Sequence, residues 1–205
     1  LYTCIIPAVA CTLLLCPAVH AHPPTSSLIT TALQPFVDSH SLAGAVTLVA
    51  DKEKIISLDA VGYADIAANK PMSTNDLFWI ASQSKPITAT AFMMLVDEGK
   101  VSLDDPVAKY LPEFKNIWVE TEADNDHILL KRPVHPVTVR EILSHTSGLP
   151  FASAMEQPTL DGLPLSVAVC SYTMSPLQFQ PGTKYQYSNA GINTAGRIIE
   201  VVSGM

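Results

Sequence analysis

Apolar and polar residues alternate over two neighbouring stretches in the first third of the chain. In residues 54–61, Ile56, Leu58 and Ala60 alternate with polar side chains, which is the period of a strand with one buried face. Residues 44–50 form a second apolar run, and the three polar residues between the two runs suit a hairpin turn. The pattern predicts two paired strands whose apolar face is buried.

Helical spacing of apolar residues begins further along the chain. Residues 82–98 carry the strongest pattern, with an apolar stripe from Ile87 to Leu95 and Gly99 as the stop. Three further segments have apolar residues at helical spacing: 27–40, 165–174 and 190–203. Each is predicted to be a helix with one buried side.

Two shorter patterns lie between these helices. Thr138 and Glu141 have the spacing of a capping box, which predicts a short helix that ends near Gly148. Residues 119–136 are polar and charged and indicate an extended hairpin or loop. Two strands followed by a mostly helical block indicate an α+β fold. Because two strands alone make a marginal sheet, further strands are expected to complete it.

Length, composition and charge narrow the class of protein. A chain of 205 residues is expected to form one domain or two small ones. Its 48% hydrophobic and 15% charged residues suit a globular protein with a substantial core. The net charge of −7, without a basic run, argues against nucleic acid and against an anionic membrane surface as partners.

The first 21 residues contain no Lys, Arg, Asp or Glu, and they end in Ala18-Val19-His20-Ala21. This composition predicts a secretory signal peptide over residues 1–21, cleaved after Ala21, and a secreted or periplasmic protein. A buried or membrane helix is the alternative, although the run is short and interrupted by two prolines. We expect residues 22–205 to be the mature domain.

Cysteine usage agrees with a domain that needs no disulfide. Three of the four cysteines lie in the leader, which leaves Cys170 alone in residues 22–205. No disulfide can then form within the mature domain, and lipid modification of a leader cysteine stays open. Cys170 lies in an apolar helical segment, so a core position is expected rather than a nucleophile.

Candidate chemistry begins with Ser82 and Lys85. They are three residues apart where a helix is predicted to start, so their side chains can share one face. A hydroxyl beside an amine can act as nucleophile and proton acceptor. Pro86 is tolerated in a first helical turn, which places Ser82 at the helix N-terminus, where a developing negative charge is favoured. The alternative is a helix-capping serine beside a solvated lysine.

A second candidate group lies about a hundred residues downstream. Tyr187, Ser188 and Asn189 follow the turn at Pro181-Gly182, and a phenol can relay a proton between a serine and a leaving group. The alternative is a core tyrosine beside a helix-capping asparagine. Between the two groups runs Ile-Leu-Ser-His-Thr-Ser-Gly-Leu, residues 142–149.

These three segments together identify a family resemblance. Residues 80–89 (IASQSKPITA), 142–149 (ILSHTSGL) and 179–191 (FQPGTKYQYSNAG) resemble the serine β-lactamase and penicillin-binding-protein superfamily, closest to its class C β-lactamase-like and esterase branch. The resemblance covers almost everything after about residue 41. It implies an antiparallel sheet flanked by helices, with an inserted mostly helical domain, as in β-lactamases and transpeptidases.

The resemblance also implies roles for individual residues. Ser82 becomes the nucleophile and its backbone N–H one oxyanion-hole donor, with Lys85 and Tyr187 moving the proton. Asn189 becomes a hydrogen-bond partner of Lys85 and of a substrate carbonyl. His145, in contrast, is expected to be structural, because no Gly-x-Ser-x-Gly elbow accompanies it.

The family's third motif has no match in this sequence. That motif lies on a C-terminal strand, which also supplies an oxyanion-hole donor. We therefore expect the domain to be incomplete after Met205, and the fragment to be inactive and poorly soluble by itself. Losing one such donor typically costs on the order of 10²–10³ in rate.

The sequence thus predicts a serine hydrolase that forms an acyl-enzyme with ester or amide substrates and needs no cofactor or metal. A true β-lactamase or D-Ala-peptidase is the narrower enzyme alternative, and a non-catalytic peptide- or cell-wall-binding protein is the alternative from another class. The expected partners are small-molecule esters, amides or β-lactams, without stable membrane insertion after signal cleavage. Four residues could suggest a metal site, but their spacing fits no zinc or calcium pattern: Asp124, Asp126, His127 and His135.

Overall fold

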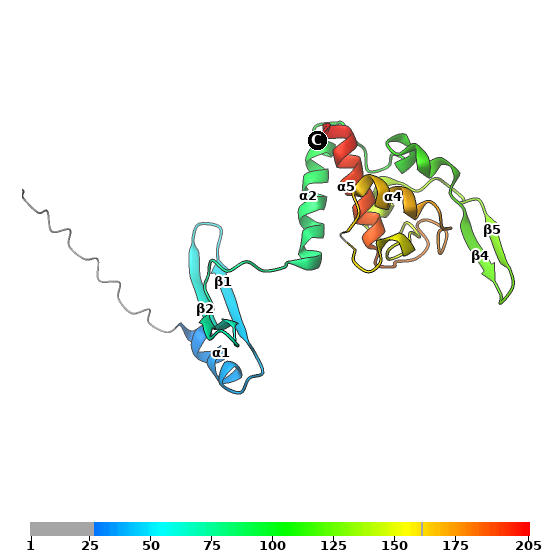
Figure 1. Ribbon diagram of the computed structural model, residues 1–205. Helices are drawn as coiled ribbons and strands as arrows, with labels where there is room; N and C mark the ends of the chain where they lie inside the picture. The colour runs from blue at the N-terminus through cyan, green and yellow to red at the C-terminus, as the bar shows by residue number, and fades with distance from the viewer. Residues whose placement is uncertain (1–26, 161) are drawn as a thin grey trace, which may run out of the picture. The chain divides into compact units, whose positions relative to one another are not determined.

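The computed structural model describes residues 27–160 and 162–205, and the chain separates into two compact units (Figure 1). The smaller unit ends at Trp79, and the larger unit runs from Ile80 to Met205. The predicted signal peptide lies outside the described residues.

The smaller unit consists of one helix and a short antiparallel sheet. Helix α1 spans Leu28–Asp38, and strands β1 (Gly44–Ala50), β2 (Ile55–Asp65) and β3 (Lys70–Pro71) pair in the order β1-β2-β3. The predicted helix and both predicted strands are confirmed. Strand β2 continues beyond its predicted end, and β3 is an addition to the prediction because two residues are too few for a periodic pattern.

The two faces of this sheet differ in burial. Leu58 pairs with Leu48 across the hairpin, and both side chains are exposed, at 46% and 58%. The face beside α1 is the alternate one, where Val61 is buried. Ile56 and Leu58, on the apolar face of β2, are thus exposed in the described unit. Period-2 patterning identifies an apolar face but does not say which face a helix covers.

Polar contacts explain why α1 takes the mixed face. Ser27 caps α1 by accepting a hydrogen bond from the Thr30 N–H at 3.0 Å. Asp59 lies near this helix start. Hydrogen bonds from Ser57, and then from Ser27 and Thr30, lower the pKa of the Asp59 carboxyl. A carboxylate on β2 thus lies at the N-terminus of α1, where negative charge is favoured.

The larger unit is mostly helical. Its α-helices are α2 (Ser84–Asp97), α3 (Val139–Leu143), α4 (Leu165–Tyr172) and α5 (Asn189–Ser203). Single 3-10 turns span Ala81–Gln83, Val107–Lys109, Pro112–Asn116 and Ala154–Glu156. Strands β4 (Val119–Ala123) and β5 (Ile128–Lys131) form an antiparallel hairpin, as expected for residues 119–136. Helix α5 contacts α2, α3 and α4 (Figure 1).

The core of the larger unit surrounds α5. Fully buried side chains come from every neighbouring element, and the largest include Phe92, Ile142, Leu149, Tyr172, Leu177 and Ile198. The predicted capping box at Thr138 and Glu141 is present, although α3 already ends at Leu143. Gly204 ends α5 with φ 79°, as predicted for a left-handed stop.

One predicted core residue faces solvent. Helix α4 turns Ala168, Val169 and Tyr172 toward the core, and this orientation leaves Cys170 exposed. The core position expected for Cys170 is therefore wrong. An eight-residue helix that is apolar on nearly all sides gives little periodic signal for choosing its buried side.

Candidate active site

Ser82 lies in a 3-10 turn that leads directly into α2. The turn spans Ala81–Gln83, and Pro86 falls in the first turn of the helix, as predicted. Ala81 has φ 45°, in the left-handed region that is unfavourable for a residue with a Cβ atom. Strain of this kind is concentrated at functional sites. Here it directly precedes the predicted nucleophile, whose side chain is exposed.

Three predicted catalytic side chains meet at the Ser82 hydroxyl. The Lys85 ammonium donates a hydrogen bond to Ser82 Oγ at 3.3 Å, and the Tyr187 hydroxyl donates one at 2.6 Å. Lys85 Nζ also lies 4.9 Å from the centroid of the Tyr187 ring. The fold thus joins residues that are 105 positions apart in sequence.

The charge beside Tyr187 changes its acidity. Hydrogen bonding to Lys85, and then to Ser82, lowers the pKa of the Tyr187 phenol from its ordinary value. A phenol with a lowered pKa is better suited to accept and return a proton near neutral pH. The Tyr187 side chain is 37% exposed, so a substrate can reach the hydroxyl.

Asn189 occupies the first position of α5, two residues beyond Tyr187. Its backbone N–H donates to the Phe151 carbonyl at 3.0 Å. Its side-chain oxygen Oδ1 is buried and accepts no hydrogen bond from the described residues. The expected hydrogen bond from Lys85 to this oxygen is therefore wrong for this structure. A buried, unpaired amide oxygen is costly and calls for an explanation.

Residues 144–151 form a loop, the SHTSGLPF loop, which holds the segment that carries Tyr187. The Gln186 N–H donates to the His145 carbonyl at 2.8 Å, and the Ser188 N–H donates to His145 Nδ1 at 3.2 Å. The Ser188 hydroxyl donates to the Pro150 carbonyl at 2.6 Å. The sequence identified this loop as structural, and these contacts show that it positions the tyrosine.

A close approach of two backbones fixes this loop. The Gln178 N–H donates to the Gly148 carbonyl at 2.8 Å. Gly148 has φ 81°, and a Cβ atom there would lie 2.4 Å from the Phe179 carbonyl oxygen. Only glycine fits both conditions. The glycine was visible in the sequence, but the chain segment that it approaches was not.

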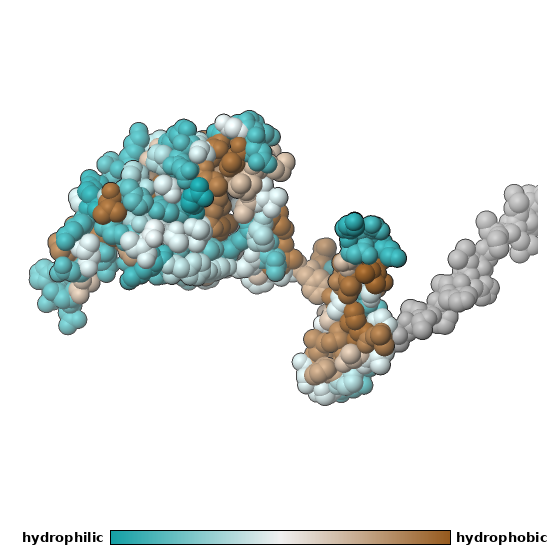
Figure 2. Space-filling view, turned by 180° about the vertical axis from the view of Figure 1, so that it is seen from behind, coloured by the Kyte–Doolittle hydropathy of each residue, from teal (hydrophilic) through white to brown (hydrophobic). Residues whose placement is uncertain are grey.

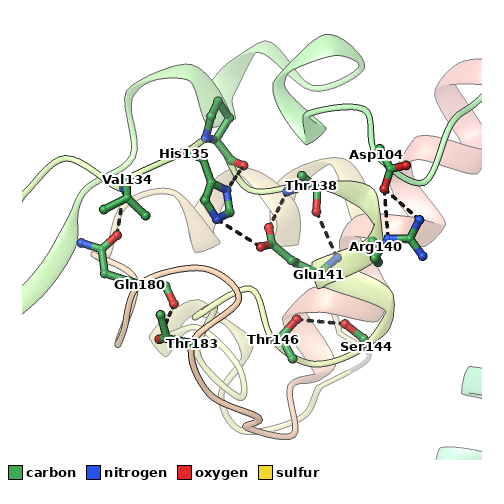
Figure 3. Close-up of polar contacts among 11 residues, drawn as sticks. Asp104, Val134, His135, Thr138, Arg140, Glu141, Ser144, Thr146, Gln180 and Thr183 are labelled. Atoms are coloured by element: carbon green, nitrogen blue, oxygen red, sulfur yellow. Dashed lines mark hydrogen bonds and ion pairs between the residues drawn. The ribbon is translucent and has the colours of Figure 1, made fainter.

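Polar contacts link the segment before Tyr187 to the residues that precede α3, and further contacts hold those residues to α3 itself (Figure 3). Gln180 Oε1 accepts the Val134 N–H at 2.9 Å. Glu141 Oε2 accepts the Thr138 N–H at 2.8 Å within the capping box, and Glu141 Oε1 lies 3.6 Å from His135 Nε2. These contacts account for the position of the His135 side chain without a bound metal ion.

The remaining acidic and histidine residues of the suggested metal group belong to a turn. Asp124 Oδ1 accepts the N–H groups of Asp126 and His127, at 2.8 and 2.7 Å, between β4 and β5. Within residues 27–160 and 162–205, no group of three or more His, Cys, Asp or Glu side chains is placed to hold a metal ion. In the same residues, no helix is long and apolar enough to cross a membrane.

Comparison with known proteins adds a family to this geometry. The family model described as Beta-lactamase matches residues 29–205. Esterase EstB of Burkholderia gladioli is 35% identical over 175 residues, which cover 80% of this chain and 42% of the esterase. A penicillin-binding protein of Bacillus subtilis (strain 168) is 32% identical over 180 residues, or 82% of this chain and 34% of that protein.

A solved structure agrees with the predicted fold. The hydrolase EstCE1, which has promiscuous acyltransferase activity, aligns with a TM-score of 0.68 at 31% identity and covers 85% of this chain. The alignment covers 46% of EstCE1, so the chain spans less than half the length of each of these relatives. The predicted α+β fold of the β-lactamase and transpeptidase type is confirmed.

Proposed function

Because the chain belongs to the β-lactamase family, we propose that its protein is a serine hydrolase that forms an acyl-enzyme at Ser82. The observation that carries the proposal is the pair of hydrogen bonds that Ser82 Oγ receives from Lys85 and Tyr187. The related proteins include an esterase, a penicillin-binding protein and a hydrolase with acyltransferase activity. The proposed substrates of this protein are small esters or amides.

The reaction follows from the three side chains. In the reactive form the Tyr187 phenol has lost its proton and is a phenolate beside the Lys85 ammonium. Ser82 Oγ attacks the substrate carbonyl carbon while the phenolate takes the Ser82 proton. The negative charge that develops on the carbonyl oxygen is stabilised in part by the Ser82 N–H. Tyr187 then returns the proton to the departing alkoxide or amine, so that the acyl group remains on Ser82. Water then attacks the carbonyl carbon of the acyl-Ser82 ester, the phenolate takes a proton from the water and passes it to the departing Ser82 Oγ, and the acid is released.

Asn189 adds a substrate contact to this scheme. Its buried Oδ1 accepts no hydrogen bond within the described residues and lies two residues beyond the catalytic phenol in sequence. Because this oxygen is buried, the group of Asn189 offered to a substrate would be its side-chain N–H, which can donate to a substrate carbonyl. We therefore assign Asn189 to substrate binding rather than to the chemical step.

Covalent labelling tests the nucleophile directly. A fluorophosphonate probe should label the full-length protein at Ser82, and Ser82→Ala should abolish labelling and turnover without unfolding the protein. Ser84→Ala is the matched control, because Ser84 is the next serine along the chain, whereas the Tyr187 hydroxyl donates to Ser82. An adduct on the Ser82→Ala protein would refute the assignment.

Tyr187→Phe separates chemistry from binding. Since the hydroxyl is needed for proton transfer, turnover should fall on the order of 10²–10⁴-fold while the Michaelis constant changes little. An unchanged turnover number with a raised Michaelis constant would show that Tyr187 binds substrate instead.

A comparison of substrates distinguishes an esterase from a β-lactamase. We propose faster turnover of small activated esters than of β-lactams, in line with the related esterase. Comparing a nitrophenyl ester with a chromogenic cephalosporin decides the point, and much faster cephalosporin cleavage would favour the β-lactamase reading. No labelling at all, together with retained peptide or cell-wall binding, would favour the non-catalytic alternative.

We also propose that the protein acts outside the cytoplasm, on the strength of the apolar, uncharged residues 1–21. Mass spectrometry of the mature protein should find His22 as its first residue. A mature protein that keeps residues 1–21 would contradict secretion by this route.

A further inference from the structure

His145 contacts the chain on both sides of Tyr187. Its carbonyl accepts the Gln186 N–H at 2.8 Å, and its ring nitrogen Nδ1 accepts the Ser188 N–H at 3.2 Å. The two residues that flank the catalytic tyrosine are thus hydrogen-bonded to a single histidine. This arrangement fixes the backbone from which the phenol projects.

The imidazole also contacts the phenol ring itself. The centroids of the His145 and Tyr187 rings are 4.7 Å apart with a 34° angle between the ring planes. The Phe151 ring lies 6.2 Å from the phenol centroid, with a 31° angle between the ring planes. Two rings of the SHTSGLPF loop thus contact Tyr187, whose hydroxyl donates to Ser82 Oγ.

This contact requires an uncharged imidazole. A backbone N–H can only donate, so Nδ1 must be the unprotonated nitrogen and the proton must be on Nε2. Adding a second proton would place an N–H against the Ser188 N–H and break the hydrogen bond. It would also place a positive charge near Lys85.

The surroundings of His145 keep the ring neutral. Burial, and then the positive charge of Lys85 from α2, lower the pKa of the imidazole. The other titratable groups that face the ring are Tyr187 and Tyr185, the latter edge-on at 5.8 Å. No carboxylate among the described residues pairs with His145 to favour the imidazolium.

We propose that neutral His145 is a positioning residue that holds Tyr187 on Ser82 and releases it when the imidazole is protonated. The inference rests on the proposed function, since it concerns the geometry of the proposed proton-transfer group. It makes His145 an internal pH gate rather than a member of a Ser-His pair. The activity should therefore fall on the acid side through protonation of a residue that never contacts substrate.

The test compares His145→Asn with His145→Ala in the full-length protein. Asparagine offers an oxygen near the place of Nδ1, does not titrate and tolerates the left-handed backbone of this position, which has φ 60°. His145→Ala removes the acceptor as well. We expect His145→Asn to keep the neutral-pH turnover within about tenfold and to lose one protonation step from the acid limb. His145→Ala should lower turnover by about 10²-fold with little change in the Michaelis constant.

His40→Asn is the matched control, because His40 has the same left-handed backbone, with φ 58°, and lies in the other unit. It should keep both the rate and the pH profile of the natural protein. Normalised profiles of the natural and His145→Asn proteins that superimpose would overturn the proposal.

A spectroscopic measurement separates this inference from the proposed function. The amide proton of Ser188 should lose its hydrogen-bonded NMR shift as His145 is protonated, and it should lack that shift at every pH in His145→Ala. If the natural protein takes no fluorophosphonate label, the proposed function fails, and this amide alone decides whether His145 holds the segment. A chemical shift of the Ser188 amide proton that stays constant while His145 is protonated would refute the positioning role.

Discussion

The two units of the chain bury very different amounts of apolar surface. Among the described residues of the smaller unit, the buried apolar side chains are Val37 and Val61. The larger unit has a continuous core that links α2, α3, α4 and α5. Figure 2 shows hydrophobic side chains gathered on the surface of the smaller unit, where Leu48 and Leu58 are exposed.

This difference explains where a precise site can be built. Ser82, Lys85 and Tyr187 all lie in the larger unit, as do His145 and Asn189. Catalytic groups need to be held within a fraction of an ångström, and this precision comes from packed cores and satisfied hydrogen bonds. The larger unit supplies both around these residues.

The largest expected effect on stability comes from creating a cavity in the core of the larger unit. Phe92 lies on α2, the helix that carries Lys85, and its side chain is 0% exposed. Phe92→Ala should lower the free energy of unfolding of this unit by about 3–5 kcal/mol, because it leaves a cavity. Amide hydrogen exchange in α5 measures this, since α5 contacts α2. Unchanged exchange in α5 would show that the larger unit has no common core.

The elements of this core were predictable from periodicity, whereas the partners of the site were not. The capping box of α3 and the stop of α5 at Gly204 are local patterns, and both are present. The stripe predicted for α2 is wrong in part: Leu95 is buried, but Ile87 and Met94 are exposed and Phe92 is buried instead. The approach of Ser82 to Tyr187 joins distant segments. Only the family resemblance pointed to it, because spacing along one chain carries no information on long-range contacts.

The next effect tests the close approach that holds the SHTSGLPF loop. Gly148→Ala puts a Cβ atom against the Phe179 carbonyl and places alanine at φ 81°. We expect a loss of about 1–3 kcal/mol in the free energy of unfolding of the larger unit. Fluorophosphonate labelling should slow as well, because the same loop positions Tyr187. The matched control is Gly99→Ala, which also has positive φ but meets no atom within 4 Å. Equal losses in both variants would show that strain, not the collision, sets the cost.

Alternation identified the apolar face of the small sheet but could not identify the face that α1 covers. Ile56, Leu58 and Ala60 form the more apolar side of β2. Helix α1 lies against the other side, where Asp59 lies near the start of that helix and Val61 is buried. Apolar character predicts that a face can be buried, but the contacts of a short polar cluster decide which face α1 takes.

The smallest expected effect comes from comparing an exposed and a buried residue of the same strand, β2. Leu58→Thr alters an exposed side chain and introduces a β-branched residue that suits a strand, so the free energy of unfolding of the smaller unit should change by no more than about 0.5 kcal/mol. Val61→Ala, three residues away and 6% exposed, should cost about 1.5 kcal/mol through the loss of two methyl groups. Amide exchange in β1 reports both, because β1 pairs with β2 along its whole length. If Leu58→Thr costs as much as Val61→Ala, the exposed face is covered in solution, and the contrast between the two units is smaller than their buried surfaces indicate.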